Sequence, residues 1–263
     1  MSTTSAEPLL LRHDEDGIAL LTMNRPQARN ALSVALMEAM QGAIDAIARD
    51  ASVKVVVIAG AGPGFCAGHD LKEMRANPGR QHYDALFRQC SHLMTSIVKL
   101  AKPVIARVHG IAAAAGCQLV ATCDLAVAAS DARFAVNGIN VGLFCSTPMV
   151  ALSRAVGRKA ALEMLLTGDL VGAEQARAIG LINRVVAPER LDDETMALAR
   201  HIAGKLGLAV AIGKEAFYRQ AELGLEAAYA YTGEVMTTNM MARETEEGID
   251  AFLAKRPPPW DKR

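Results

Sequence analysis

The sequence predicts an α/β protein, in which β-strands alternate with α-helices. Residues 53–59 form a nearly continuous run of β-branched side chains, which is typical of a strand covered on both faces. A strand, a turn and a helix follow one another again over residues 104–129, with short connections, as they do in α/β folds. The chain of 263 residues is half apolar and has no linker rich in proline or serine, so it can bury one large core.

Turn and cap signals place the first elements. Residues 9–11 and 18–23 have β-like composition and flank Asp14-Glu15-Asp16-Gly17, a turn signal that predicts an opening hairpin. A polar loop follows over residues 24–30. Ser33 can cap the next helix, which should extend to about Arg49. One face of that helix carries apolar residues at spacings of four and three, namely Leu36, Met40, Ile44 and Ile47.

The later elements follow from the same signals. We expect strands at residues 104–108 and 125–129, with an alanine-rich helix at 112–122 between them. Ser146-Thr147-Pro148 predicts a helix start, with a capping hydroxyl and a proline in the first turn. One further strand is expected at 181–186, and three successive helices are expected at about 190–204, 209–223 and 243–255.

These elements divide the chain into two regions. Residues 1–190 should form the core, and residues 191–263 should form a C-terminal helical region. Because the C-terminal helices are apolar on several faces, we expect them to pack on neighbouring subunits.

The charge balance argues against a nucleic-acid partner. The chain has 28 basic and 28 acidic residues, so it lacks the positive surface expected of a protein that binds a polyanion. No stretch reaches the roughly 18 apolar residues of a membrane span, so we expect no membrane partner. Residues 1–8 are too short and too weakly charged for a targeting peptide, which favours a cytoplasmic location.

The five cysteines predict free thiols in a reducing compartment. Their number is odd, none forms a C-x-x-C pair, and most lie in apolar surroundings. Neither a disulfide framework nor a metal site is expected from residues 66, 90, 117, 123 and 145.

Two small-residue segments carry the chemistry, residues 65–71 and 110–119. Each places a turn after a β-rich run, where backbone N–H groups are free to face a developing negative charge. The first turn exposes the N–H of His69, and the second, Ala114-Ala115-Gly116, opens a helix at the positive end of its dipole. Two such donors suit the oxygen of a thioester and of the enolate derived from it. The alternative is that both turns only allow close packing.

The glycine-rich stretch Gly60-Ala-Gly62-Pro-Gly64 has a different explanation. Its spacing differs from the G-x-G-x-x-G of a dinucleotide loop, and Pro63 removes an N–H from any phosphate cradle. We therefore expect these glycines to let the chain leave its strand and turn sharply.

Short motifs along nearly the whole chain occur in a fixed order. They include Asn24-Arg-Pro, Asn30-Ala-Leu, Phe65-Cys-Ala-Gly-His-Asp-Leu71, Lys102-Pro-Val-Ile-Ala, Gly116-Cys-Gln-Leu, Cys123-Asp, Ala178-x-Gly-Leu and Glu247-Gly. With them the chain resembles the crotonase (enoyl-CoA hydratase/isomerase) superfamily. The segment Asn140-Val-Gly-Leu-Phe-Cys-Ser-Thr-Pro148 is similar, more narrowly, to the subgroup called enoyl-CoA hydratase domain-containing protein 3.

The resemblance implies both a fold and a ligand. The fold would be the ClpP/crotonase-like spiral of ββα repeats, with a C-terminal helical trimerisation region. The protein would be a lyase or isomerase of fatty acyl-CoA metabolism, and it would assemble as a homotrimer or a dimer of trimers. No cofactor is implied, because coenzyme A belongs to the thioester substrate.

The resemblance also assigns site residues. The oxyanion donors fall on the N–H groups of His69 and Ala115, with Gly116 beside them. Phe252 and Lys255 resemble tail residues that contact adenine and phosphate groups at an adjoining subunit, although a solvated helix end would also explain Lys255. The remaining coenzyme A contacts, mostly through backbone atoms, fall on Ala28, Ala67, Gly68, Asp70 and Leu71.

Two departures from the family pattern bear on the reaction. Hydratases of this family hold the added water with two glutamates, and these positions are Gln118 and Gly138 here. Glutamine cannot accept and return a proton at neutral pH, and glycine has no side chain. We therefore expect little hydration, and we expect glutamates at both positions to raise it.

Other groups could replace the missing acids. Ala67-Gly-His69-Asp also resembles the methylmalonyl-CoA decarboxylase branch, in which His69 could face the carboxylate that is lost, although the tyrosine of that branch aligns with Cys145. Further polar candidates near the second position are Asn137, Asn140, Cys145 and Ser146. Three functions stay open: a hydratase/isomerase-type enzyme, a decarboxylase or other enolate-forming enzyme that uses His69, and a non-catalytic acyl-CoA-binding protein.

Overall fold

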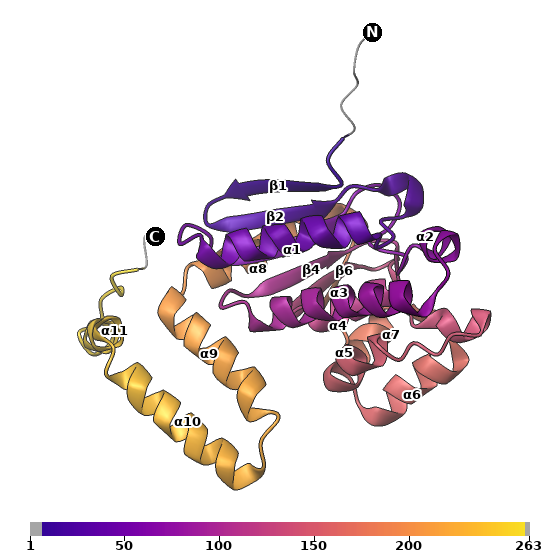
Figure 1. Ribbon diagram of the computed structural model, residues 1–263. Helices are drawn as coiled ribbons and strands as arrows, with labels where there is room; N and C mark the ends of the chain where they lie inside the picture. Colours follow the sequence, from indigo (N-terminus) through magenta and orange to yellow (C-terminus); the bar gives the residue numbers. More distant parts are fainter. Residues whose placement is uncertain (1–6, 261–263) are drawn as a thin grey trace.

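The computed structural model describes residues 7–260, which form two sheets surrounded by helices (Figure 1). The larger sheet has the strand order β1-β2-β3-β4-β6-β9, and all its neighbouring strands except β1 and β2 run parallel. Its strands are β1 (Leu10–Glu15), β2 (Ile18–Met23), β3 (Val55–Gly60), β4 (Val104–Val108), β6 (Leu125–Ala129) and β9 (Arg184–Val186). The smaller sheet consists of β5 (Ile111–Ala113), β7 (Arg133–Ala135) and β8 (Val171–Gly172).

The helices alternate with the strands and then dominate the C-terminal part. The first seven are α1 (Val34–Arg49), α2 (Leu71–Ala76), α3 (Arg80–Lys99), α4 (Ala115–Thr122), α5 (Pro148–Ala155), α6 (Arg158–Thr167) and α7 (Ala173–Ala178). The last four are α8 (Leu191–Ala203), α9 (Gly207–Gln220), α10 (Leu225–Met240) and α11 (Arg243–Leu253). Short 3-10 turns are η1 (Pro26–Ala28), η2 (Asn137–Val141) and η3 (Pro188–Arg190). The α/β class expected from the sequence is confirmed.

The opening hairpin is confirmed, and its turn explains the register. Asp16 and Gly17 both have positive φ, 52° and 78°, so the two-residue turn matches the twist of the strands that it joins. The pairing Glu15–Ile18 therefore closes the hairpin, and β1 extends further than the predicted residues 9–11.

Helix α1 forms as predicted. The Ser33 hydroxyl accepts a hydrogen bond from the Leu36 N–H at 3.2 Å and thereby caps the first turn. The four apolar residues expected on its inner face are buried. Figure 1 shows α1 and α3 on one face of the large sheet. Helix α8 covers the other face, where Leu191 and Ala199 join a cluster with Val55 and Val57 of β3.

Several predicted elements differ from the structure. The alanine-rich helix begins at Ala115 rather than at residue 112, because residues 111–113 form β5 and pair with β7. Thr147 precedes α5, but its side chain makes no capping hydrogen bond. Helices α2 and α3 were not predicted, and α10 falls between the helices expected at about 209–223 and 243–255.

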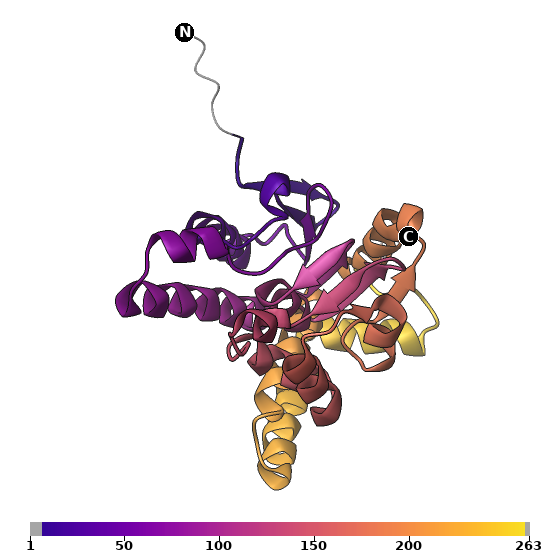
Figure 2. The ribbon, with the colours of Figure 1, turned by 90° about the vertical axis from the view of Figure 1, so that its right-hand side faces the viewer.

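The C-terminal helices separate into two groups. Helix α8 packs on the sheet, whereas α9 and α10 pack on each other and extend away from the body (Figures 1 and 2). Helix α10 has no buried residue within the chain. Among the described residues no single helix is long and apolar enough to cross a membrane. One pair of helices, residues 188–203 and 207–220, passes the test of length and composition only when the two are taken together, and they are bent by 103°.

A partly buried ion pair fastens α9 to the core. The Lys214 ammonium lies 2.7 Å from an Asp124 carboxylate oxygen, and it also donates to the carbonyls of Ile97 and Lys102, each at 3.0 Å. The Tyr218 hydroxyl donates to the second Asp124 oxygen at 2.8 Å. Burial lowers the pKa of Lys214, and the negative charge of Asp124 opposes this effect. The contacts of Lys214 join α9 to the end of α3 and to Asp124, just beyond the end of α4.

We expect Lys214→Met to lower the free energy of unfolding by about 1–3 kcal/mol, because it leaves the partly buried Asp124 carboxylate without its cation. Lys159→Met, at an exposed lysine of α6, should change it by less than about 0.5 kcal/mol. Urea unfolding at one protein concentration measures both variants. Equal effects of the two substitutions would contradict the anchoring role.

Candidate active site

The two predicted turns lie against each other, and Cys66 joins them. Its N–H donates to the Ile111 carbonyl at 3.0 Å, and its carbonyl accepts from the Ala113 N–H at 2.9 Å. Glycine is required where the backbones meet. A Cβ on Gly116 would lie 2.1 Å from the Cys66 oxygen, and one on Gly68 would lie 2.9 Å from the Ala114 Cβ.

The backbone of Ala114 turns the first N–H of α4 outward. Ala114 has φ 48° and ψ −115°, a conformation that an L-residue rarely adopts, and its own N–H is held by the Ala135 carbonyl at 2.8 Å. Within residues 7–260 the N–H of Ala115 donates to no acceptor. It therefore lies free at the positive end of the α4 dipole.

The N–H of His69 is free for a different reason. Residues on either side of it pair with Leu32, whose N–H donates to the Gly68 carbonyl at 2.7 Å and whose carbonyl accepts from the Asp70 N–H at 3.2 Å. In such a bridge the intervening residue directs its own N–H to the opposite side. A Cβ on Gly68 would be 3.3 Å from the Ala115 nitrogen, so the two free donors belong to adjacent turns.

The His69 ring packs edge-on against Phe87 of α3, with 5.7 Å between the ring centroids. Both ring nitrogens are inaccessible to solvent and neither makes a hydrogen bond of good geometry in the described part of the chain, although the Leu32 backbone lies close enough to the ring to oppose the effect of burial on its pKa. Burial lowers the pKa of His69, so the ring is neutral at pH 7. A neutral imidazole beside a free N–H can donate one hydrogen bond to a ligand and accept one from it.

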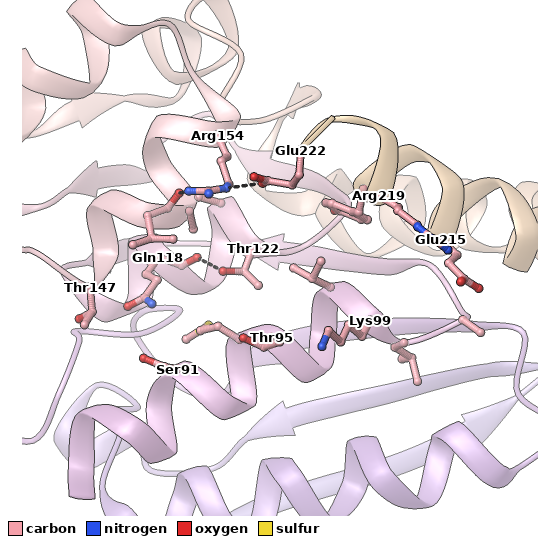
Figure 3. Close-up of a pocket in the computed structure, with 18 residues that line it drawn as sticks. Ser91, Thr95, Lys99, Gln118, Thr122, Thr147, Arg154, Glu215, Arg219 and Glu222 are labelled. Atoms are coloured by element: carbon pink, nitrogen blue, oxygen red, sulfur yellow. Dashed lines mark hydrogen bonds and ion pairs between the residues drawn. The ribbon is translucent and has the colours of Figure 1, made fainter. Parts of the chain in front are cut away.

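Gln118 lies one turn along α4 from Ala115 and lines a cavity of about 740 Å³. The cavity lies between α3, α4, α5 and α9, with largely apolar walls (Figure 3). Gln118 is only 4% exposed, and no described residue donates to its Oε1 atom. Of the predicted site residues, it alone is among the residues that line this cavity.

The second missing acid, at Gly138, has no room for a side chain. A Cβ there would lie 2.5 Å from the Leu143 carbonyl oxygen and 2.8 Å from the Cys145 sulfur. A glutamate at this position would therefore force the 143–145 loop to shift, and the expectation that glutamates at both positions raise hydration stays a prediction. The sequence could not show this obstruction, since it comes from a backbone carbonyl.

The other polar candidates near this loop make local contacts. The Gly138 N–H donates to the Cys145 sulfur at 3.3 Å, and burial raises the pKa of that thiol, which leaves it protonated and weakly nucleophilic. The Asn140 amide donates to the Gly168 carbonyl at 3.4 Å, and the Ser146 hydroxyl donates to the Phe144 carbonyl at 3.3 Å. Asn137 begins η2.

The expected coenzyme A segments lie side by side. The Ala67 N–H donates to the carbonyl of Arg29, which directly follows Ala28 at the end of η1. Leu71, at the start of α2, is 51% exposed. Asp70 caps α2 and pairs with Arg25 at 2.9 Å. Burial raises the pKa of this carboxyl, but the hydrogen bonds that it accepts from the Arg25 guanidinium and from the backbone N–H groups of Glu73 and Lys72 lower it overall.

Phe252 and Lys255 do not join this group within one chain. They lie at the end of α11, and Figures 1 and 2 place α11 far from α2. Phe252 is 82% exposed. These residues can therefore contact a ligand at the turns only across a subunit boundary.

Sequence reasoning missed most of the cavity wall. Thr95 of α3, Arg154 of α5 and Tyr218 of α9 line the cavity with Gln118. They come from helices that are far apart in sequence, and no motif links them. Within residues 7–260 no three histidine, cysteine or acidic side chains form a group that could hold a metal ion.

Comparison with known proteins gives consistent matches. A family model described as enoyl-CoA hydratase/isomerase matches residues 13–263. The human enoyl-CoA hydratase domain-containing protein 3, mitochondrial, is 48% identical over 245 residues, which cover 93% of this chain and 81% of that protein. A crystal structure of this human protein has a TM-score of 0.93 at 45% identity, and the match covers 96% of this chain and 100% of that one. A crystal structure of enoyl-CoA hydratase from Mycobacterium smegmatis has a TM-score of 0.95 at 60% identity and covers 97% and 99% of the two chains.

The expected cytoplasmic location is wrong on these comparisons. The human, Xenopus laevis and rat relatives all carry the word mitochondrial in their names, which points to the mitochondrion rather than to the cytoplasm. The prediction failed because buried free thiols are compatible with any reducing compartment. The cysteines therefore could not distinguish the cytoplasm from the mitochondrion. Of residues 1–8, on which the absence of a targeting peptide was argued, residues 1–6 lie outside the described residues.

Proposed function

The chain belongs to the enoyl-CoA hydratase/isomerase family, and on that premise we propose that it binds acyl-CoA thioesters through the N–H groups of His69 and Ala115. Its fold is the crotonase-type α/β fold expected from the sequence. The observation that carries the proposal is the conformation of Ala114, which frees the Ala115 N–H at the start of α4 beside the His69 turn. Two donors that meet one oxygen stabilise the negative charge of an enolate more than that of the ground-state carbonyl.

Hydration of a double bond is not the proposed reaction. An acid or base at each of the two family positions would transfer protons to and from water, and Gln118 cannot do so. At Gly138 the loop carbonyl of Leu143 occupies the place of a side chain. The binding donors are backbone groups, so the loss of the two acids leaves them in place.

A second candidate is an enolate-forming reaction such as decarboxylation, and the His69 ring favours it. Its two nitrogens are buried and make no hydrogen bond of good geometry, and a ligand that supplied one would offset the cost of burying them. Because the ring is neutral, it would act on a carboxylate as a hydrogen-bond donor. The electron pair of the broken carbon–carbon bond would move to the thioester oxygen held by the two N–H groups.

We further propose that the chain assembles as a trimer or a dimer of trimers. Helix α10 exposes Leu225 and Tyr229, each 74% accessible, and α11 exposes Phe252. Large apolar side chains exposed on a helical face are typical of subunit contacts. Such contacts would also bring Phe252 and Lys255 to the coenzyme A groups of a neighbouring subunit.

We expect calorimetry to detect binding of crotonyl-CoA, and the rate of its hydration to be near background. Gln118→Glu alone should raise that rate by about tenfold or more, because one proton-transfer group returns next to donors that are already in place. Gly138→Glu should not raise it and should lower the melting temperature, because its side chain displaces the 143–145 loop.

The matched control is Gly42→Glu, at an exposed glycine of α1 with nothing within 4 Å of an added Cβ, which should leave folding intact. Rapid hydration by the wild-type protein would contradict the role given to Gln118. The absence of binding to any acyl-CoA would contradict the proposed function as a whole.

His69→Ala should change the affinity for an acyl-CoA by no more than about tenfold, since the N–H remains. If the ring is catalytic, decarboxylation of a malonyl-type thioester should disappear in this variant. His13→Ala, on β1, is the control. No decarboxylation by the wild-type protein would favour the non-catalytic binding alternative.

The pH dependence of stability gives His69 a second test. Its pKa is lowered on folding, so below about pH 6.5 the unfolded chain binds more protons than the folded one, and stability falls as the pH falls towards the folded pKa. Above that pH neither state is protonated and the contribution is absent. His69→Ala should reduce the loss of melting temperature between pH 7.5 and pH 5, whereas His13→Ala should not.

Light scattering at micromolar concentration should give the mass of three or six chains. Tyr229→Lys should shift the protein to smaller species, because it places a charge in the proposed contact. A wild-type monomer would contradict the proposed assembly.

A further inference from the structure

The loop before α1 carries two polar side chains that the proposed function leaves without a role, those of Arg25 and Asn30. Both make hydrogen bonds that lead to the turn containing His69. We infer that Asn30, together with Arg25, is a positioning residue that directs the His69 N–H at the thioester oxygen. This role rests on the proposed function, which requires that donor.

The side chain of Asn30 is completely buried and makes three hydrogen bonds. Its Nδ2 atom donates to the carbonyls of Ala61 at 2.9 Å and Gly64 at 2.8 Å, and its Oδ1 atom accepts from the Arg25 N–H at 2.9 Å. One side chain therefore joins both ends of the 61–64 turn to the loop before α1. The chain runs from this turn directly into the segment that carries the donor, so the turn determines where that segment begins.

The residues next to Asn30 hold the donor turn itself. The Arg29 carbonyl accepts from the Ala67 N–H at 3.0 Å, and Leu32 forms hydrogen bonds with both neighbours of His69. These contacts all lie within two residues of the donor along the chain. A shift of the loop around Asn30 would therefore move the His69 N–H with it.

The backbone of this loop needs the two side chains to keep its shape. Arg29 and Asn30 are successive residues with positive φ, 47° and 55°, which L-residues rarely adopt. The Asn30 N–H donates to the Arg25 carbonyl at 2.9 Å. The Arg25 guanidinium donates to the Ala31 carbonyl and, at 2.9 Å, to an Asp70 carboxylate oxygen. Without these contacts the loop would relax towards more common conformations.

The direction of the His69 N–H affects one part of the ligand only. A hydrogen bond weakens steeply as its angle departs from linear, so a rotated N–H would bind the thioester oxygen less well. The acyl chain and the coenzyme A groups make no contact that depends on this direction. Loss of alignment should therefore weaken only ligands that contain the carbonyl oxygen.

Calorimetry of the full chain with octanoyl-CoA and its thioether analogue S-octyl-CoA tests this role. The thioether lacks only the carbonyl oxygen, and the wild-type protein should bind the thioester about tenfold more tightly. Asn30→Gly permits the positive φ and removes the side chain, and it should reduce this ratio of affinities to about threefold or less. Partial unfolding would lower both affinities equally and leave the ratio unchanged.

Two further variants separate alignment from stability. Thr195→Val removes a buried hydroxyl that donates to the Leu191 carbonyl within α8, and it should keep the wild-type ratio whatever its effect on the melting temperature. Arg25→Lys keeps a cation near Asp70 but cannot make both contacts of the guanidinium. It should lower the ratio in the same direction as Asn30→Gly, and it decides the question if that variant does not fold.

The ratio of affinities distinguishes a failure of the positioning role from a failure of the proposed function. Equal wild-type affinities for the two ligands would overturn the proposed donors, and the positioning role with them. A wild-type preference of about tenfold that folded Asn30→Gly retains, or that Arg25→Lys retains where Asn30→Gly does not fold, would overturn the positioning role alone. An equal fall of the ratio in Thr195→Val would also overturn it, because the effect would then follow stability and not the His69 turn.

Discussion

The close approach of two backbone segments, residues 65–69 and 111–116, is the constraint on which the candidate site depends. The Cys66 peptide group exchanges hydrogen bonds with both ends of β5, and this pairing leaves less than a side chain's width between the segments. Gly68 and Gly116 are needed at the contact because any Cβ would meet backbone or Ala114. Once the segments are held in this way, the start of α4 and the His69 turn face the same region, and the direction of α4 places Gln118 at the cavity.

Local signals in the sequence were sufficient for much of the fold. The Asp16-Gly17 turn, the Ser33 cap and the buried β3 run each act over a few residues, so their effect could be predicted without tertiary information. Helix α10 was not predicted; several of its large apolar residues are exposed, and none of its residues is buried within the chain. The late start of α4 depends on the pairing of β5 with β7, a contact between segments about 20 residues apart that alanine-rich composition does not indicate.

The candidate site was predictable in part for the same reason. Both donor turns were identified because small residues after a strand leave N–H groups free, which is a local property. The obstruction at Gly138 and the cavity wall from α9 depend on distant segments. Lys214 and Tyr218 of α9 hold that wall to Asp124, just beyond the end of α4. The pairing links the C-terminal helices to the helix that carries the N–H donor at its other end.

The alanine at position 114 has a consequence for the energetics of binding. Glycine could adopt its positive φ freely, whereas an alanine in this conformation costs about 1–3 kcal/mol. The methyl group also restricts the alternative conformations that a glycine turn would sample. The donor direction of Ala115 is thus preorganised: the ordering cost falls on folding, once for each molecule, and not on every association with a ligand. Alanine at this position therefore makes the turn less stable than glycine would, and it makes the anion site more rigid.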